Sequence, residues 1–256
     1  MIKLDNVSMA FLNNRVLENI SLEIAEGEIM VIIGPSGSGK STILRLMIGL
    51  LRPDSGEIWI NGQEISRLGE EELNVIRRNM GMVFQYSALF DSMTVGENVA
   101  FGLRQHTALS EEEIARTVRR RLRMVGLAGR EDVMPSQLSG GMKKRVSLAR
   151  AIASNPQIVL YDEPTAGLDP IMSTTIDRLI CSTRRILNVT SVVVTHHMSS
   201  AFNIADRIAM IYEGRIIEIG TVSEIKKSAN PIVQQFIHGW TNPGQFAKRR
   251  SRKSES

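Results

Sequence analysis

The chain has 256 residues, of which 43% are hydrophobic, so it can bury the core of one large α/β domain. Its one cysteine, Cys181, excludes a disulfide within the chain and suits a reducing compartment. The formal net charge of +4 comes entirely from residues 241–256, where five Lys or Arg residues oppose Glu255. Because the remaining 240 residues have no net charge, we expect no nucleic-acid partner.

The two ends of the chain give no signal for secretion or membrane insertion. The N-terminus has Lys3 and Asp5 where a signal peptide needs a continuous apolar stretch, and no run reaches the roughly 18 apolar residues of a spanning helix. We therefore expect a cytoplasmic chain that does not itself cross a membrane. Residues 241–256 combine basic residues with Pro243, Gly244 and hydroxyl side chains, which is typical of a disordered tail. Binding of this tail to anionic lipid or RNA is the less favoured alternative.

Antiparallel strands are predicted near both ends of the domain. Apolar residues alternate over residues 20–24, and again over residues 58–60 before an Asn-Gly pair that favours a hairpin turn. Residues 207–218, interrupted by Glu213 and Gly214, predict a closing hairpin. Between these segments we expect a mostly parallel core sheet with flanking helices.

A glycine-rich segment between a strand pattern and a helix pattern predicts a phosphate-binding loop. Residues 28–33 are a short apolar run of strand length, and residues 42–48 have apolar side chains at helical spacing. The segment between them fits G-x-x-x-x-G-K-[ST], whose glycines let backbone N–H groups turn toward phosphate oxygens beside a helix N-terminus. A glycine-rich turn with a chance lysine is the alternative. The expected nucleotide-binding residues are Gly34, Pro35, Ser36, Gly37, Ser38, Gly39, Lys40, Ser41 and Thr42.

Two residues at the end of this loop have the chemistry that a nucleotide with magnesium requires. Lys40 supplies a mobile positive charge that can reach the β- and γ-phosphates. Ser41 supplies a hydroxyl ligand for an octahedral Mg²⁺ that bridges them. ATP and Mg²⁺ are therefore the expected ligands.

Residues 88–140 are dense in helix signals and lack runs of β-branched residues. They predict a helical subdomain inserted into the core, with limits near residues 88 and 155. One of its helices is well marked, because Ser110 and Glu113 form a capping box and Gly126 ends the apolar periodicity. The arginines near its C-terminal end suit the helix dipole, so this basic cluster has a structural explanation.

The run Leu138 to Met142 reads Leu-Ser-Gly-Gly-Met. Ser139 can cap a helix over residues 143–152, and the two glycines leave N–H groups open to an anion. Taken alone, a Ser-Gly-Gly sequence is more typical of a flexible turn.

Residues 158–161 and 192–194 are uninterrupted apolar runs, as in strands buried on both faces of a parallel sheet. The first run ends in Asp162 and Glu163. At the carboxyl end of a strand beside the phosphate loop, Asp162 is expected to hold Mg²⁺ through its water shell, and Glu163 to polarise a water for attack on the γ-phosphorus. A simple turn before Pro164 is the alternative reading of these two acids.

Together these motifs resemble the ATP-binding-cassette (ABC) ATPases over residues 1–240. The resemblance implies a P-loop NTPase core with an N-terminal antiparallel subdomain and a helical insertion. In that family the Leu-Ser-Gly-Gly run binds the γ-phosphate of ATP held by the opposite subunit. A homodimer is therefore implied, in which Ser139, Gly140 and Gly141 act in trans, together with integral-membrane permease subunits as partners.

The same resemblance gives expected roles to residues outside these motifs. Phe11 stands where an aromatic side chain stacks on adenine, although a core aromatic is the alternative. Gln85 matches the loop glutamine that meets Mg²⁺ and the attacking water and couples to the membrane partner. Asp169 matches the loop that crosses the dimer interface, and His196 matches the histidine that contacts the γ-phosphate. His197 departs from the family, which often has aspartate there, and an exposed side chain without a role is its favoured interpretation.

A more specific resemblance is to the ATPase subunits of Mla/Mce-type phospholipid transporters of bacteria. It implies lipid cargo, a place on the inner face of the cytoplasmic membrane and a Mce-type lipid-binding subunit as partner, and it leaves a small regulatory subunit open. The alternatives are an ABC transporter for another cargo, such as polar amino acids or lipoproteins, and a cassette ATPase that serves as an assembly scaffold or mechanical relay. The resemblance rests on residues 85–95, 97–101, 103–107, 134–138, Met142 and 235–239.

Overall fold

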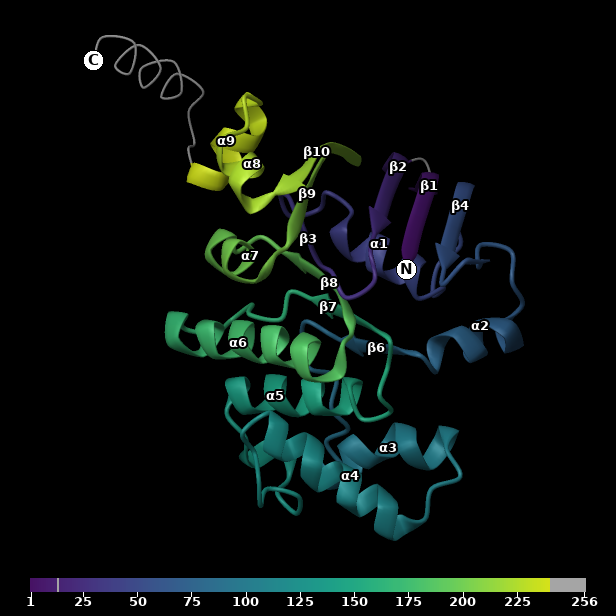
Figure 1. Ribbon diagram of the computed structural model, residues 1–256, viewed down its shortest axis with the longest axis vertical. Coiled ribbons are helices and arrows are strands. Elements are labelled where there is room, and N and C mark those ends of the chain that lie inside the picture. The colour runs from purple at the N-terminus through teal and green to yellow at the C-terminus, as the bar shows by residue number, and fades with distance from the viewer. Residues whose placement is uncertain (13, 240–256) are drawn as a thin grey trace.

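The computed structural model describes residues 1–12 and 14–239 (Figure 1). It confirms the expected α/β fold, with one antiparallel sheet, one mostly parallel sheet and flanking helices.

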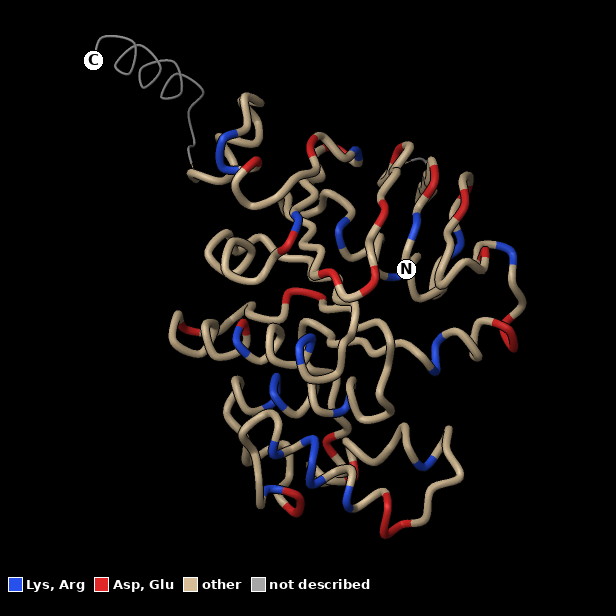
Figure 2. Tube along the Cα trace, viewed as in Figure 1, with Lys and Arg blue, Asp and Glu red and all other residues tan. Residues whose placement is uncertain are grey.

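The basic tail predicted at 241–256 lies outside the described residues. Within the described ranges no helix has the length and apolar character to cross a bilayer. Acidic and basic residues are interspersed along the described chain (Figure 2).

The N-terminal sheet has four strands in the order β2-β1-β4-β5. The alternating residues Ile20, Leu22 and Ile24 are buried, and Ile2 lies opposite both Ile24 and Ile60, so the predicted antiparallel pairing is confirmed. The Asn-Gly pair after β4 has positive φ at both residues, as a tight hairpin turn requires. The strands are β1 (Ile2–Phe11), β2 (Asn14–Ile24), β4 (Ser55–Ile60) and β5 (Gln63–Glu64).

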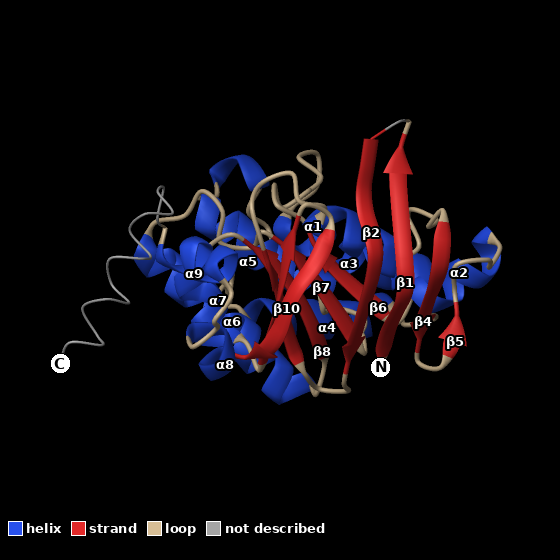
Figure 3. Ribbon diagram, turned by 90° about the horizontal axis from the view of Figure 1, so that it is seen from above, coloured by secondary structure: helices blue, strands red, loops and turns tan. Residues whose placement is uncertain are grey.

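The main sheet has six strands in the order β10-β9-β3-β8-β7-β6, and it lies beside the antiparallel sheet (Figure 3). All neighbours are parallel except β10, which closes the sheet as the expected antiparallel hairpin with β9. Every residue of the three strands β3, β7 and β8 is buried, which confirms the burial predicted from the apolar runs of β7 and β8. The strands are β3 (Ile29–Ile33), β6 (Met80–Val83), β7 (Ile158–Asp162), β8 (Thr190–Thr195), β9 (Arg207–Tyr212) and β10 (Arg215–Thr221).

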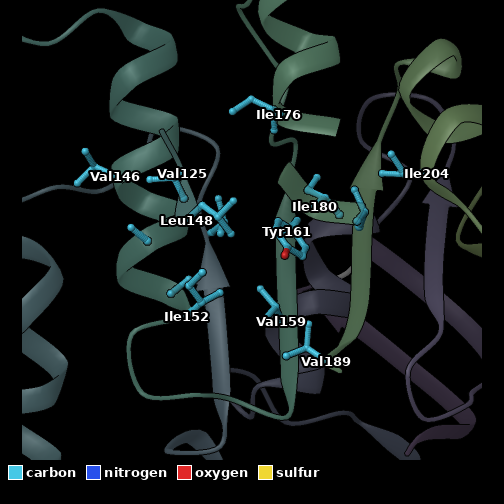
Figure 4. Close-up of a cluster of buried hydrophobic side chains, with 14 of the residues drawn as sticks. Val125, Val146, Leu148, Ile152, Val159, Tyr161, Ile176, Ile180, Val189 and Ile204 are labelled. Carbon is cyan, nitrogen blue, oxygen red and sulfur yellow. The ribbon is translucent and has the colours of Figure 1, made fainter. Parts of the chain in front are cut away.

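Each face of the main sheet has its own hydrophobic core. Along β3, Ile29, Val31 and Ile33 enter one core, and Met30 and Ile32 enter the other. The second core also contains helix α1 (Lys40–Met47) and the antiparallel sheet. The first core joins the sheet to the helices around it, as in the close-up of β7 against its helical neighbours (Figure 4). The remaining helices outside the 88–155 region are α2 (Glu70–Arg77), α6 (Pro170–Leu187), α7 (Met198–Ile204), α8 (Val222–Lys226) and α9 (Pro231–His238).

Helices α3 (Val95–His106), α4 (Glu111–Met124) and α5 (Gly140–Ala151) lie between β6 and β7 in the chain. The capping box of α4 is confirmed: Glu113 N–H donates to Ser110 Oγ at 3.4 Å and Ser110 N–H donates to Glu113 Oε2 at 2.8 Å. One boundary differs from the prediction, because α5 begins at Gly140 rather than at residue 143. Ser139 caps it there, accepting from Met142 N–H at 3.3 Å, so both glycines belong to its first turn.

Candidate nucleotide-binding site

The site is built at the carboxyl ends of three adjacent parallel strands. The phosphate loop follows β3, Asp162 ends β7 with Glu163 directly after it, and His196 follows β8. Since these strand ends meet at one edge of the sheet, the segments converge there. A cavity of about 300 Å³ is lined by the loop together with Gln85, Glu163 and His196. The structure thus brings together side chains that the sequence analysis selected one by one.

The phosphate loop leaves donors available at the start of α1. Lys40, the first residue of the helix, is 7% exposed, and its Nζ donates to the carbonyl oxygens of Gly34 and Pro35 at 2.8 and 2.9 Å. The N-cap, Gly39, has a φ of 100° and offers no side chain to cap the first turn. Ser38 Oγ is buried without a hydrogen-bond partner in the described chain. A lysine, uncapped N–H groups and an orphaned hydroxyl form a donor set that fits a phosphate group.

Burial acts on the charge of Lys40. Desolvation lowers the pKa of its ammonium, and the carboxylates of Glu163 and Asp162 oppose that effect. The ammonium therefore lies in surroundings where a further anion would be attracted strongly, because little water screens it.

The loop depends on glycine at position 34 because of a close backbone approach. A Cβ there would lie 2.2 Å from the carbonyl oxygen of Ile211, which is backbone and has little freedom to move away. We expect Gly34→Ala to lower the free energy of unfolding without nucleotide by about 3 kcal/mol. At Gly37, φ is 79° but an added Cβ would meet no atom within 4 Å, so Gly37→Ala should cost only about 1 kcal/mol. Urea unfolding of both variants tests this, and equal losses would contradict the contact argument.

A hydroxyl and a carboxylate meet beside the loop. Ser41 Oγ donates to Asp162 Oδ1 at 2.9 Å, so one hard oxygen comes from α1 and another from the end of β7. Gln85, on the loop after β6, lines the same cavity and has an amide oxygen among its side-chain atoms. Oxygen ligands of this kind are the ones that Mg²⁺ selects, so the residues present fit the metal expected from the sequence.

Without a ligand, the charged carboxylate of Asp162 lowers the free energy of unfolding, and this is its cost to the folded chain. Burial raises its pKa, the hydrogen bond from Ser41 lowers it, and the nearby charge of Glu163 raises it again. Because the folded chain disfavours the charged form, this cost is present at neutral pH and disappears as the pH falls through the folded pKa toward the ordinary value.

We therefore expect Asp162→Asn to raise the Tm of the nucleotide-free chain at neutral pH by about 2–4 °C, with a smaller gain at acidic pH. The same change should lower Mg²⁺-dependent ATP hydrolysis at least about tenfold, because a neutral amide is a poorer ligand. Thermal unfolding and ATPase assays measure the two effects, with Asp91→Asn as an exposed control. A lower Tm for Asp162→Asn would refute the assigned cost of burial.

Glu163 is oriented by contacts to both carboxylate oxygens. Its Oε1 lies 2.9 Å from His196 Nδ1, and its Oε2 accepts from Thr195 Oγ1 at 3.2 Å and from His196 N–H at 3.4 Å. Glu163 is 8% exposed and has a φ of 46°, a left-handed backbone conformation that is costly for a non-glycine residue. The His196 side chain is 46% exposed, so it reaches solvent as well as the carboxylate. The arrangement holds a carboxylate and an imidazole as one unit at the cavity.

The expected exposure of the His197 side chain is wrong, because the residue is half-buried. That His197 has no role in the site stays a prediction. Its Nδ1 lies 3.1 Å from Thr165 Oγ1, and its ring packs edge-on against His196 with 4.4 Å between ring centroids. The residue is half-buried as the N-cap of α7, directly between the β8 end and the segment after Glu163. Sequence alone gives no signal for this contact, since Thr165 is 32 residues away.

Other predicted residues lie outside the cavity of their own chain. Ser139 caps α5, and Gly141 lies against Met172 of α6, where an added Cβ would come within 2.4 Å of the Met172 Cε. Asp169 caps α6 by accepting from Ile171 N–H and Met172 N–H, each at 2.9 Å. Phe11 ends β1, is 43% exposed and does not line the cavity. That these residues contact the nucleotide or the second subunit stays a prediction.

Two residues near this site have no role predicted from the sequence. Val16 of β2 lines the cavity, and the sequence has no signal for this position because an apolar residue in a strand is typical of the core. Lys144 of α5 is 6% exposed and donates to the carbonyl oxygen of Glu163 at 3.3 Å. The burial of Lys144 could be predicted from helical spacing, because Gly141 and Leu148 place position 144 on the buried face of the helix.

Comparisons with known proteins agree with this geometry. A family model described as ABC transporter matches residues 17–166. The intermembrane phospholipid transport system ATP-binding protein MlaF of Haemophilus influenzae is 41% identical over 239 residues, covering 93% of this chain and 90% of MlaF. The methionine import ATP-binding protein MetN of Carboxydothermus hydrogenoformans is 43% identical over 242 residues, covering 93% of this chain and 72% of MetN.

A solved structure is also similar over most of the chain. It is the dimeric post-hydrolysis state of the ATP-binding cassette MJ0796 bound to ADP and Pi, with a TM-score of 0.80 and 36% identity. The match covers 87% of this chain and 99% of that one. With the family match, the MlaF identity and the convergence of the phosphate loop on Asp162 and Glu163, the chain belongs to the ABC transporter family as an ATPase.

Proposed function

We propose that the chain is the ATP-hydrolysing subunit of a transporter that moves phospholipids between bacterial membranes, and that it works as a homodimer on the inner face of the cytoplasmic membrane. The ATPase part rests on one cavity that holds the phosphate loop, Glu163 and His196 together. The lipid part is supported by 41% identity to MlaF over 90% of that protein. Dimerisation is supported by the similarity to a dimeric cassette.

In the proposed reaction, Lys40 and the N–H groups at the start of α1 bind the β- and γ-phosphates of ATP. Mg²⁺, for which Ser41, Asp162 and Gln85 supply oxygen atoms, would neutralise charge on the phosphate oxygens. Glu163 accepts a proton from water as the water oxygen attacks the γ-phosphorus in line. The bond from that phosphorus to the β-phosphate oxygen breaks, and ADP and phosphate result.

The remaining residues act around this centre in the proposal. His196 contacts the γ-phosphate and keeps the Glu163 carboxylate turned toward the attacking water. Phe11 stacks on adenine. In the closed dimer, Ser139, Gly140 and Gly141 of the second copy bind the same γ-phosphate, and Asp169 lies at the dimer interface. ATP then bridges the two subunits, and its hydrolysis removes the bridge.

The proposed partners follow from this cycle. Permease subunits would receive the closing motion through the loop that contains Gln85, and a Mce-type subunit would bind the lipid. A small regulatory subunit is compatible with the same arrangement. A different cargo is the second candidate, favoured by 43% identity to a methionine import ATPase.

Copurification with the neighbouring gene products tests the proposal. The chain is expressed with those genes, purified through a tag in mild detergent, and its bound proteins and lipids are identified by mass spectrometry. We expect a permease, a lipid-binding subunit and phospholipid enriched over a purification of the same tagged chain expressed without its neighbours. A permease that copurifies without lipid enrichment would favour another cargo. A soluble partner without any membrane protein would refute the transporter proposal and leave a scaffold or relay role.

A further inference from the structure

Two cations of α5 hold the loop that contains Gln85. Lys144 Nζ donates to the Gln85 carbonyl oxygen. Six residues further along the helix, Arg150 donates to the carbonyl oxygens of Ala88 and Ser87 at 2.6 and 3.2 Å. Figure 2 marks the basic residues along this helix. The loop is therefore tied to α5 through its backbone, whatever side chains it presents to the cavity.

The loop needs such support because its backbone is strained. Ser87 and Ala88 have φ values of 64° and 48°, two successive left-handed residues that are not glycine. Each such residue costs roughly 1–2 kcal/mol relative to an ordinary conformation. Hydrogen bonds from outside the loop can hold that conformation, and a cation donating to a carbonyl is one of the stronger kinds.

Lys144 reaches the catalytic centre with the same ammonium. Its Nζ also donates to the carbonyl oxygen of Glu163 at 3.3 Å, on a residue with a left-handed φ of 46°. Lys144 is 6% exposed, and burial lowers its pKa while the charges of Asp162 and Glu163 oppose that effect. A buried ammonium that donates to two separate segments fixes their distance from each other.

We propose that Lys144 is a positioning residue for ATP hydrolysis. It holds the Gln85 loop and the Glu163 backbone against α5, so that the side chains of Gln85 and Glu163 reach the cavity in the positions that hydrolysis requires. The inference rests on the proposed roles of Gln85 and Glu163. Because α5 begins at the Ser139 cap, movement of its N-terminal turn on dimer closure is transmitted through Lys144 to both segments at once.

The test compares steady-state ATP hydrolysis by the full chain with Lys144→Met, Lys144→Gln and Lys144→Arg. Lys143→Met is the matched control, since the described part of the chain offers the neighbouring Lys143 side chain no hydrogen bond or ion pair. We expect Lys144→Met to lower kcat by about 10- to 100-fold with KM for ATP within about threefold, because misplaced groups slow chemistry more than binding. Lys144→Arg should recover most of kcat, and Lys143→Met should match the parent.

A second measurement follows the loop itself. Hydrogen exchange of the peptide covering residues 84–90 should be faster in Lys144→Met than in the parent or in Lys143→Met. If Lys144→Met does not fold, Lys144→Gln serves in its place, since its NH2 group can still donate hydrogen bonds but carries no charge. It should show the same pattern to a smaller degree.

Three results would overturn the inference. The first is a folded Lys144→Met or Lys144→Gln with parental kcat. The second is a loss of kcat/KM that a rise in KM explains completely, and the third is a folded Lys144→Arg with a kcat as low as that of Lys144→Met. Glu163→Gln in the same assay separates this failure from failure of the proposed chemistry. If Glu163→Gln hydrolyses ATP at the parental rate, the role of Glu163 is wrong, whatever Lys144 does.

Discussion

Glu163→Gln is expected to lower kcat for ATP hydrolysis by about 10²–10⁴-fold, the usual contribution of a general base, while the affinity for ATP stays close to that of the parent. Glutamine keeps the shape of the side chain and one oxygen that can accept from Thr195 Oγ1 and His196 N–H. It loses the ability to take a proton from water. ATP should then bind and remain, so the nucleotide that bridges two subunits is not removed and a stable dimer accumulates.

Rapid-quench measurement of phosphate release gives the rate, and analytical ultracentrifugation with ATP and Mg²⁺ gives the dimer. Glu213→Gln is a matched control, because Glu213 is exposed in the β9–β10 turn and has the same φ of 46° as Glu163. The control should hydrolyse ATP at the parental rate and show no added dimer. Parental hydrolysis by Glu163→Gln would remove Glu163 from the role of base.

Lys40→Ala is expected to weaken ATP binding by about 100-fold, or about 3 kcal/mol. The variant removes the one ammonium that the phosphate loop places at the start of α1. It also leaves the carbonyl oxygens of Gly34 and Pro35 without the hydrogen bonds at 2.8 and 2.9 Å that shape the free loop. Both effects act against the bound state, because the cavity loses a positive charge and the loop loses part of its order.

Isothermal titration with ATP and Mg²⁺ measures the affinity, and a thermal melt without nucleotide shows whether the variant is folded. Lys3→Ala is a suitable control, since Lys3 lies exposed on β1 and pairs with Asp5 at 2.8 Å, away from the loop. An affinity for ATP that is unaltered in folded Lys40→Ala would contradict the assignment of the phosphate loop.

The sequence predicts those parts of the fold that depend on contacts between residues close together in the chain. The glycine loop lies between a strand and a helix that adjoin it in the chain, and the α4 cap needs only Ser110 and Glu113. The pattern predicts too late a start for α5 because two glycines weaken a helix pattern. The cap from Ser139 outweighs that weakness in the folded chain. Local pattern therefore finds the elements, and the start of α5 is set by a cap that is itself local.

The parts that sequence could not supply depend on contacts between distant segments. Lys144 and Gln85 are 59 residues apart, and Thr165 and His197 are 32 apart. Neither pairing follows from periodicity, since each arises only when β6, β7 and β8 are assembled in the sheet. The limits of the helical subdomain near 88 and 155 likewise stay a prediction.

The strand order has a consequence for synthesis on the ribosome. β8 lies between β3 and β7 in the main sheet, yet it ends at residue 195 of 256. Until that point of translation, β3 has neither of its neighbours, β8 and β9, and β7 is paired with β6 on one edge only, so the other edge of this apolar strand is open. Open strand edges of this kind are prone to pair wrongly with other chains. The core sheet therefore completes only after β8 and β9 have been made, and until then the nascent chain is exposed to wrong pairing.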